Sequence, residues 1–415
     1  MKTLLTFIVF LVYGILTYLT AIIFFSSYLN SSGNQIDYYS QELTSLRKEM
    51  HLGIAKDMQA LYPEGFVFTN VLYGLCSAEL VRKIDDPSKK LSWQNETRWS
   101  LSEIESNYGK SVFDSSLTPI YGTFYHSWKT WLTGKYLSII DKNNFDSTLY
   151  KNFQLDCKTI VNNYLVENNP YPESYKGVSW PADAIVGIAS LELSDNEFHT
   201  DYSKFIEKWI SSVKAGLATS KFLIPHSIQN SVPRSIEFSR GSSQSLILLF
   251  LYDIDGDFAK KQYSLFKHRF TDTFLFFSLI KESQANRTQV EDIDSGPIIF
   301  GFGSAASIVG IGTAKLYGDK ELFSDLNLGI EFSRIPAKYF FGDHVIIDLF
   351  LLWSRISEPL VQQNKHLTQN SFNNIRFIFL IIEILYTVFV IVSIKTMWFK
   401  KHANSVQILN SEEGS

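Results

Sequence analysis

One acidic loop and a separate aspartate are the residues best suited to acid/base chemistry. Glu291, Asp292 and Asp294 lie together in one short loop. Three carboxylates this close cannot all ionise at low cost in an enclosed site, so one of them is expected to keep a proton and act as an acid. Asp183 is the expected partner of Asp294, because paired carboxylates carry out glycoside hydrolysis. The alternative is that Asp183 and Asp294 only stabilise helix N-termini, as cap or first-turn residues.

A second group of candidates follows Pro119. Tyr121 and Tyr125 are spaced i, i+4, so in a helix they share one face. Tyrosine and histidine can both donate protons, so Tyr125 and His126 are expected to assist catalysis, with Tyr121 in contact with the substrate. The alternative for His126 is a structural histidine near the start of a helix.

Substrate binding is expected from a long loop and from an aromatic residue. His226, Arg234 and Arg240 lie in loop 221–240, which is longer than most connections in compact domains. An arginine can hold a carboxylate or a phosphate through two parallel hydrogen bonds. Trp180 is expected to stack on a sugar ring, and the alternative for Trp180 is a core aromatic. The alternative for the arginines is surface charge on an irregular loop. The full set of expected substrate-binding residues is Tyr121, Trp180, His226, Arg234, Arg240, Asp292 and His344.

These candidates belong to loops that recur along the chain. Six times a loop containing Gly or Pro leads into an apolar stretch, at intervals of about 55 residues, which is the signature of a repeated supersecondary unit. The residues that mark the loops are Gly65, Gly122, Asp183, Gly241, Gly296 and Gly342. The stretches that follow, such as 184–191 and 245–252, are apolar all round and predict buried helices.

Amphipathic helices are predicted between the buried ones. Phe205, Trp209 and Val213 recur at every fourth position, which places apolar side chains on one face of a surface helix. Such outer helices are predicted at 34–60, 146–166, 198–216, 257–282 and 319–333, with a weaker one near 100–109. Six alternations of outer and inner helix predict an all-α fold, an (α/α)6 toroid of six helical hairpins, flanked by one transmembrane helix at each end.

The order of these elements, with the loops Trp180-Pro-Ala-Asp183 and Asp292-Ile-Asp294-Ser-Gly-Pro297, resembles the six-hairpin (α/α)6 toroid proteins. These include glycoside hydrolases, polysaccharide lyases and the linalool dehydratase/isomerase group. The resemblance covers roughly residues 34–358. It implies a hydrolase or lyase that acts on a carbohydrate or small hydrophobic molecule at the mouth of the toroid. The alternative is a non-catalytic surface protein that binds a glycan or a partner membrane protein through the same mouth.

Apolar runs at the two ends of the chain predict membrane anchoring. The run from residue 4 to about residue 28 is uncharged, and run 377–394 contains a single charge, Glu383. As a helix, each is long enough to cross roughly 30 Å of hydrocarbon, which takes about 20 residues. Lys2 and the basic residues after the second run predict that both termini are cytoplasmic and that the central domain is extracytoplasmic, in a two-span protein of the cell membrane.

The predicted domains follow from these runs. They are an N-terminal transmembrane anchor at 1–29, the extracytoplasmic toroid at 30–373, a C-terminal transmembrane helix at 374–398 and a cytoplasmic tail at 399–415. A cleaved signal peptide is the alternative for the first run. A third span at 295–314 would indicate a transport or assembly subunit, but its glycines favour close packing between helices.

Composition narrows the range of partners. The formal net charge of −4 and the mixed charges argue against nucleic acid, so the expected partners are the lipid bilayer and a small-molecule or glycan ligand. Cys76 and Cys157 are too few for a disulfide framework and are expected as separate buried thiols, with pairing as the alternative. No metal or cofactor is expected, because the histidines show no ligand spacing. The 33 Phe and 21 Tyr predict a large aromatic core or an aromatic-lined cavity.

Overall fold

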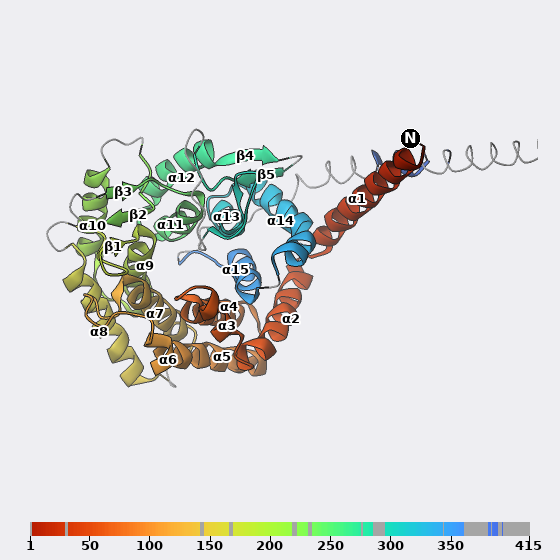
Figure 1. The fold of residues 1–415 in the computed structure, drawn as a ribbon. Coiled ribbons are helices and arrows are strands. Elements are labelled where there is room, and N and C mark those ends of the chain that lie inside the picture. The colour runs from red at the N-terminus through yellow and green to blue at the C-terminus, as the bar shows by residue number, and fades with distance from the viewer. Residues whose placement is uncertain are drawn as a thin grey trace, which may run out of the picture. The chain divides into compact units, whose positions relative to one another are not determined.

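Helices make up most of the chain, which confirms the predicted all-α class (Figure 1). The structure is a computed structural model. It describes residues 2–29, 32–141, 145–165, 169–217, 222–230, 235–274, 277–284, 295–342, 344–360, 381–382, 384–388 and 392. The chain divides into two compact units, one made of Met1–Ser32 with Thr368–Ser415 and the other of Gly33–Leu367.

Six helices of the second unit form an inner layer, and each begins shortly after one of the predicted loops. They are α4 (Gly65–Lys83), α7 (Gly122–Leu137), α9 (Pro181–Phe198), α11 (Gly241–Ile254), α13 (Ser304–Leu316) and α15 (Val345–Ile356). Each contacts the next along the chain, and α15 contacts α4, so the contacts form a closed cycle (Figure 1). These helices are buried on nearly all sides, as expected for segments that are apolar all round.

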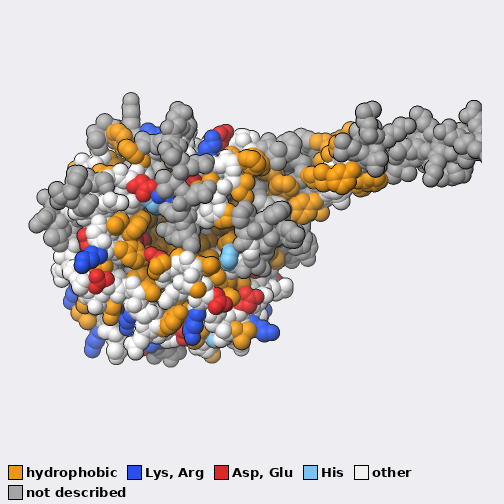
Figure 2. All heavy atoms as spheres, viewed as in Figure 1, with side chains coloured by type: hydrophobic (Ala, Val, Ile, Leu, Met, Phe, Trp, Pro, Cys, Tyr) orange, Lys and Arg blue, Asp and Glu red, His pale blue; other side chains and the backbone are white. Residues whose placement is uncertain are grey.

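Further helices, most of them amphipathic, pack against this cycle. They are α2 (Ser32–His51), α3 (Ile54–Leu61), α5 (Pro87–Glu105), α6 (Asn107–Lys110), α8 (Ser147–Asn163), α10 (Ser203–Gly216), α12 (Gly256–Phe270) and α14 (Lys320–Phe341). Arg334 of α14 joins the first and last helices of this unit, because it donates to Glu42 of α2 at 2.8 Å and to Asp348 of α15 at 2.9 Å. Figure 2 shows charges of both signs around the rim of the helical unit, with apolar side chains between them.

Short antiparallel strands lie in the connections between helices. A three-stranded sheet contains β1 (Val178–Ser179), β2 (Ser227–Gln229) and β3 (Ser235–Glu237), and two-stranded sheets pair β4 (Thr271–Phe274) with β5 (Phe277–Ile280) and β6 (Ile298–Ile299) with β7 (Phe302–Gly303). The prediction of one helix over 257–282 is therefore wrong after Phe270. The residues that follow include two Thr and three Phe, which favour a strand.

Three other predicted segments differ from the structure. Segment 34–60 is interrupted at Gly53, whose φ of 93° turns the chain between α2 and α3. The weak helix predicted near 100–109 starts too late, because α5 begins at Pro87 and ends at Glu105. Segment 295–314 divides into the β6–β7 hairpin and the first part of α13, so the described residues of this segment form no continuous helix.

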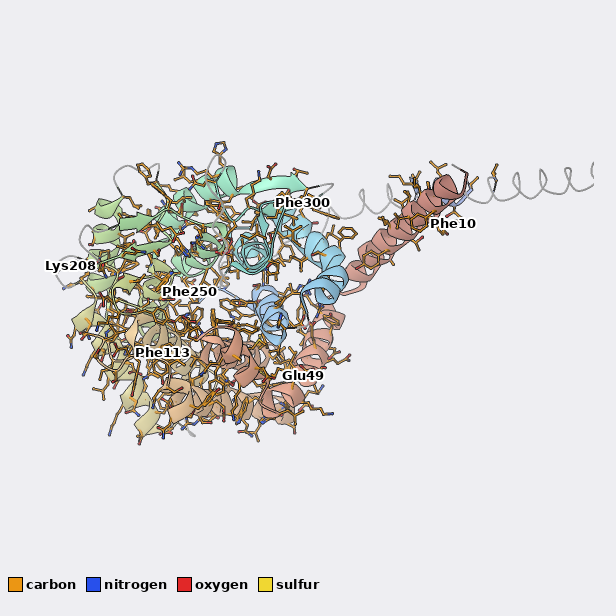
Figure 3. The ribbon with its side chains drawn as sticks, in the orientation of Figure 1. Phe10, Glu49, Phe113, Lys208, Phe250 and Phe300 are labelled. Atoms are coloured by element: carbon orange, nitrogen blue, oxygen red, sulfur yellow. The ribbon has the colours of Figure 1, made fainter. Side chains whose placement is uncertain are left out.

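Aromatic rings pack inside the cycle of inner helices. Phe68 of α4 lies 5.0 Å from Phe350 of α15, and Trp128 of α7 lies 5.7 Å from Phe250 of α11, between ring centroids. Figure 3 places Phe250 inside the cycle and Lys208 at its outer edge. This core accounts for part of the high aromatic content. Both predicted thiols, Cys76 and Cys157, are buried and free.

The terminal unit contains α1 (Lys2–Leu29). The ring of Tyr13 stacks on that of Tyr386 at 6.2 Å, and the Tyr386 hydroxyl donates to the Val9 carbonyl at 3.0 Å, so the two ends of the chain pack together within this unit. Among the residues that the structure describes, no helix combines the length and the apolar character needed to cross a membrane. Glu383 lies outside the described residues.

Candidate functional site

The N-termini of four inner helices meet on one side of the helical unit. The backbone N–H of Thr123, in α7, donates to the carbonyl of Glu173 before α9 at 2.9 Å, and β1 before α9 pairs with β2 before α11. The Gly241 N–H at the start of α11 donates to the carbonyl of Glu282, which precedes α13, at 2.9 Å. We call this surface the amino-end face, formed by residues 119–126, 171–183, 224–230, 235–244, 277–284 and 295–304.

The opposite ends of the inner helices carry basic side chains. Lys83, at the end of α4, pairs with Glu358 after α15. Lys315, at the end of α13, donates to the carbonyls of Arg355 at 2.9 Å and Ser357 at 2.8 Å, and burial lowers the pKa of Lys315 to about 8. Cations at helix C-termini complement the negative end of the helix dipole. The two ends of the inner layer therefore differ in electrostatic character, and anionic groups are best placed at the amino-end face.

Glu282 is the most perturbed carboxyl group at this face. It is fully buried and accepts hydrogen bonds from the Ser242 N–H at 3.1 Å, the Ser242 hydroxyl at 2.6 Å and the Ser295 hydroxyl at 3.1 Å. Desolvation raises the pKa of Glu282 to about 7, although these hydrogen bonds and the charge of Arg240 act to lower it. A carboxyl group with this pKa can both donate and accept a proton near neutral pH.

A hydrogen-bonded ion pair lies next to Glu282 on the amino-end face. Arg240, at the N-cap position of α11, donates through Nε to Glu237 Oε1 at 2.6 Å. Glu237 also accepts from the Ser227 hydroxyl at 3.0 Å, and His226 Nε2 lies 4.0 Å from Glu237 Oε2. Both Arg240 and His226 are buried, and the His226 N–H donates to the Glu237 carbonyl at 3.1 Å. Glu237 thus brings together two residues that the sequence predicted as substrate ligands.

Asp183 occupies the first turn of α9 on the same face. Its Oδ2 accepts from the Ser174 hydroxyl at 2.6 Å, and that hydroxyl accepts from the Trp180 N–H at 3.4 Å. The Trp180 ring meets the Tyr175 ring edge-to-face at 5.3 Å. Asp183 is only 7% exposed, so its carboxylate is held by this loop as well as by the helix N-terminus.

Tyr121, Tyr125 and His126 line one pocket. The pocket has a volume of about 290 Å³ and lies between the start of α7, the end of α5 and the outer helix α8. Tyr121 has a φ of 71°, and its ring meets that of Tyr125 edge-to-face at 5.4 Å. The Tyr125 hydroxyl donates to the Ile104 carbonyl at 3.0 Å, and burial raises the pKa of Tyr125. Its proton is therefore already engaged with the backbone.

His126 faces α8 through its Nε2 atom. His126 Nε2 lies 3.5 Å from Asp156 Oδ1, and Lys129 Nζ lies 2.7 Å from Asp156 Oδ2. Burial opposes ionisation of Asp156, but the hydrogen bond from His126 and the charge of Lys129 outweigh it and lower the pKa of Asp156. His126 Nδ1 is buried, with no hydrogen-bond partner among the described residues. Asp156 therefore positions the His126 ring through its Nε2 atom.

Aromatic rings from the first halves of α4, α7 and α15 pack together. Phe68 contacts the rings of Phe124 at 5.5 Å, Trp128 at 5.0 Å and Phe350 at 5.0 Å, between ring centroids. Phe68 and Phe350 are only half-buried, whereas Trp128 is fully buried. Inside the cycle the inner helices therefore present aromatic carbon rather than charge.

The remaining predicted residues are only partly described. Glu291, Asp292, Asp294 and Arg234 lie outside the described residues, so the predicted pairing of Asp183 with Asp294 stays a prediction. His344 is half-buried at the N-cap position of α15, and its side chain makes no cap hydrogen bond. Among the residues that the structure describes, no group of three or more His, Cys, Asp or Glu side chains has the arrangement of a metal site.

Sequence reasoning missed Glu282, Glu237 and Asp156. Glu282 lies in the segment predicted as the end of one long helix, where an acidic residue suggests only a solvated surface. Asp156 is expected on the outer face of an amphipathic helix, and nothing local in the sequence indicates that it meets His126. Each of these residues gains its role from a contact with a distant segment of the chain, which the local sequence does not show.

In the comparisons with known proteins, no family model matches the chain, and no curated protein matches it significantly.

Proposed function

We propose that the helical unit is an (α/α)6 toroid and that its amino-end face is an active site of hydrolase or lyase type. The closed cycle of contacts among the inner helices supports the toroid, because each inner helix also packs against an outer helix. The common direction of the inner helices supports a single mouth, since four of their N-termini are joined by hydrogen bonds or strand pairs. The proposed substrate is a carbohydrate or a small hydrophobic molecule.

The observation that carries this proposal is the buried carboxyl group of Glu282. Its pKa of about 7 leaves it partly protonated at neutral pH, as a general acid requires. Ser242 is half-buried and donates its hydroxyl proton to Glu282 Oε1 at 2.6 Å, so it links the buried carboxyl group to the face. In the proposed step, protonated Glu282 donates its proton to the Ser242 oxygen while the Ser242 hydroxyl gives its own proton to the departing oxygen of the substrate, as the C–O bond to that oxygen breaks. The Ser242 hydroxyl then donates to the Glu282 carboxylate, as it does in the structure.

The residues around Glu282 have complementary roles in the proposed reaction. After proton transfer, the Glu282 carboxylate is stabilised by the N-terminus of α11 and by Arg240. Asp183 is the proposed second carboxylate, together with Asp294 from the acidic loop. Trp180 and the half-buried rings of Phe68 and Phe350 would contact the apolar face of the substrate, which suits either a sugar ring or a hydrocarbon.

We also propose that the apolar ends of the chain anchor it in a membrane, with the helical unit outside the cytoplasm. Support comes from the apolar character of runs 4–28 and 377–394 and from the basic residues that follow the second run. The side chains of Phe7 and Leu11 on α1 are more than half exposed, so they present apolar surface. Lipid would remove this surface from water.

Substitution of Glu282 tests the catalytic proposal. The purified full-length chain is assayed on neutral polysaccharides for new reducing ends, on uronate-containing polysaccharides for unsaturated products and on an allylic terpene alcohol for dehydration. We expect one of these activities, and we expect Glu282→Gln to reduce it by about 100-fold because the general acid is removed. Thermal unfolding should show that Glu282→Gln stays folded, since the change removes a buried ionisable group without removing volume.

Glu192→Gln is the matched control. Burial also raises the pKa of Glu192, but this residue lies in the second half of α9, away from the amino-end face. Its activity should equal that of the unmodified chain. Full activity in Glu282→Gln, or equal losses in both variants, would contradict the assignment of Glu282 as the acid.

A further inference from the structure

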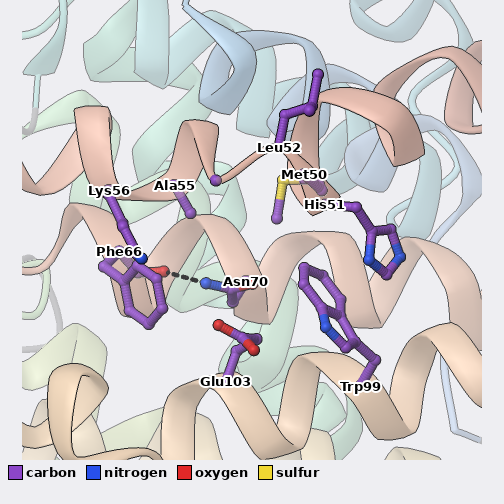
Figure 4. A pocket seen from close by; sticks show the side chains of 10 residues that line it. Met50, His51, Leu52, Ala55, Lys56, Phe66, Asn70, Trp99 and Glu103 are labelled. Atoms are coloured by element: carbon purple, nitrogen blue, oxygen red, sulfur yellow. Dashed lines mark hydrogen bonds between the residues drawn. The ribbon is translucent and has the colours of Figure 1, made fainter.

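A second pocket of the helical unit lies between the end of α2 and the helices α3, α4 and α5. Its volume is about 270 Å³ (Figure 4). Met50, Phe66 and Trp99 supply apolar walls, and Asn70 and Glu103 supply oxygen atoms between them. None of these residues belongs to the amino-end face or to the proposed catalytic machinery.

Asn70 is the central polar group of this pocket. The residue is 1% exposed, and its Nδ2 donates to the Phe66 carbonyl at 2.9 Å, shown as the dashed line in Figure 4. This bond orients the amide, because the reverse orientation would place two oxygens together. Asn70 Oδ1 has no hydrogen-bond partner among the described residues. A buried acceptor without a donor destabilises the protein, so this atom favours a ligand that brings a donor.

Two charged side chains complete the polar lining. Glu103, from α5, is half-buried, and its carboxylate has no hydrogen bond or ion pair with any described residue. Lys56, from α3, lies with its Nζ 5.5 Å from the centroid of the Tyr108 ring. The pocket therefore offers acceptors from Asn70 and Glu103 and a donor from Lys56.

Neighbouring aromatic rings hold Trp99, the aromatic wall of the pocket, in place. Trp99 packs against the His51 ring at 4.2 Å and meets the Tyr73 ring edge-to-face at 5.9 Å. His51 is fixed in turn by Glu96, since His51 Nε2 and Glu96 Oε2 are 2.8 Å apart. Preorganised aromatic side chains lose little conformational entropy when a ligand binds.

We propose that this pocket binds a neutral pyranose unit. Its hydroxyl groups would donate to Asn70 Oδ1 and to the Glu103 carboxylate and accept from Lys56, and its C–H groups would pack on Trp99 and Met50. A purely apolar ligand would leave Asn70 Oδ1 unpaired, and a charged ligand would meet one attractive and one repulsive charge, because Lys56 and Glu103 have opposite signs. A ligand with several hydroxyl groups and an apolar ring face satisfies the whole lining.

Saturation-transfer NMR on the full-length chain tests this proposal with four probes. They are methyl α-D-glucopyranoside, methyl β-D-galactopyranoside, methyl β-D-xylopyranoside and N-acetylglucosamine. We expect at least one probe to bind and its Kd to rise at least 10-fold in Asn70→Leu and in Glu103→Gln. Glu103→Gln keeps the side-chain shape at a half-buried position, so it remains informative if Asn70→Leu fails to fold.

Asn196→Leu is the matched control. Asn196 makes the same type of bond, from Nδ2 to the Glu192 carbonyl at 2.9 Å, but at an exposed position of α9. Its Kd for the probe should be unchanged. The absence of binding by all four probes, or an unchanged Kd in Glu103→Gln, would overturn the proposal. The catalytic test on Glu282 is separate, because Glu103→Gln should leave any activity of the amino-end face intact.

Discussion

Glu282 differs from an ordinary helix-capping carboxylate in both position and burial. Asp86, Asp146 and Asp255 cap α5, α8 and α12 from the residue just before each helix. Glu282 reaches α11 from a distant segment and is fully buried. The helix N-terminus and the hydrogen bonds favour its ionised form, but the loss of hydration outweighs them. Burial therefore holds the Glu282 carboxyl group near its titration point at neutral pH.

The raised pKa of Glu282 makes stability depend on pH in a defined direction. Between the ordinary value of 4.5 and about 7, the folded chain holds a proton that the unfolded chain lacks, so the free energy of unfolding falls as pH rises through this window. The full loss is about 3 kcal/mol, at 1.36 kcal/mol per pKa unit. Urea denaturation at pH 4.5 and pH 8 should show this loss, and in Glu282→Gln the difference between the two pH values should shrink by that amount.

Glu207→Gln is the control for this measurement, since Glu207 is exposed on α10. Its pH profile should match that of the unmodified chain. A Glu282→Gln variant with the same pH dependence as the unmodified chain would mean that Glu282 is ionised throughout and acts only as a cap.

At the scale of elements, the amino-end face depends on close backbone contacts at the starts of the inner helices. A Cβ atom on Gly241, the first residue of α11, would lie 2.0 Å from the carbonyl oxygen of Lys281. Glycine at this position allows the segment that carries Glu282 to pack directly on the start of α11. The same contact brings the Gly241 N–H to the Glu282 carbonyl at 2.9 Å.

Gly241→Ala should therefore destabilise the fold, and Gly256→Ala should not. A Cβ at Gly241 forces a backbone shift that costs about 1 to 3 kcal/mol. Gly256 also begins a helix, α12, but a Cβ there meets nothing within 4 Å. Alanine at Gly256 is expected to be neutral or to stabilise by roughly 0.4 to 1 kcal/mol, because it restricts the unfolded chain. Chemical denaturation of the two variants checks the difference, and equal stabilities would contradict the close contact at Gly241.

The inner helices were predictable because burial on all sides leaves a plain signal, an uninterrupted apolar stretch after a Gly or Pro loop. The helix α5 was less visible because its buried side includes Thr97 and Ser100. The Thr97 hydroxyl donates to the Trp93 carbonyl within the helix at 2.9 Å, so this polar side chain is buried with its hydrogen bond satisfied. The partner of His126 was not predictable, since Asp156 approaches it only when α7 and α8 pack together.

At the scale of the whole molecule, the helical unit has two chemically distinct ends. Carboxylates and their hydroxyl partners gather where the inner helices begin, and lysines gather where they end. Lys135, at the end of α7, pairs with Glu79 of α4, and burial lowers the pKa of Lys135. This polarity follows from the common direction of the inner helices, because each helix end favours the opposite charge. A ligand with a developing negative charge is therefore better stabilised at the amino-end face.

The topology of the chain relative to a membrane provides the last prediction. Reporter fusions after residues 290 and 320 should lie on the same side, because the residues between them include a short hairpin and α13, and a span needs about 20 residues while α13 has 13. A fusion after residue 415 should lie on the opposite side, in the cytoplasm, if run 377–394 crosses the membrane and its basic flank stays inside. Reporters after 290 and 320 on opposite sides would indicate a third span and a transport or assembly role. Reporters after 290 and 415 on the same side would contradict the second anchor.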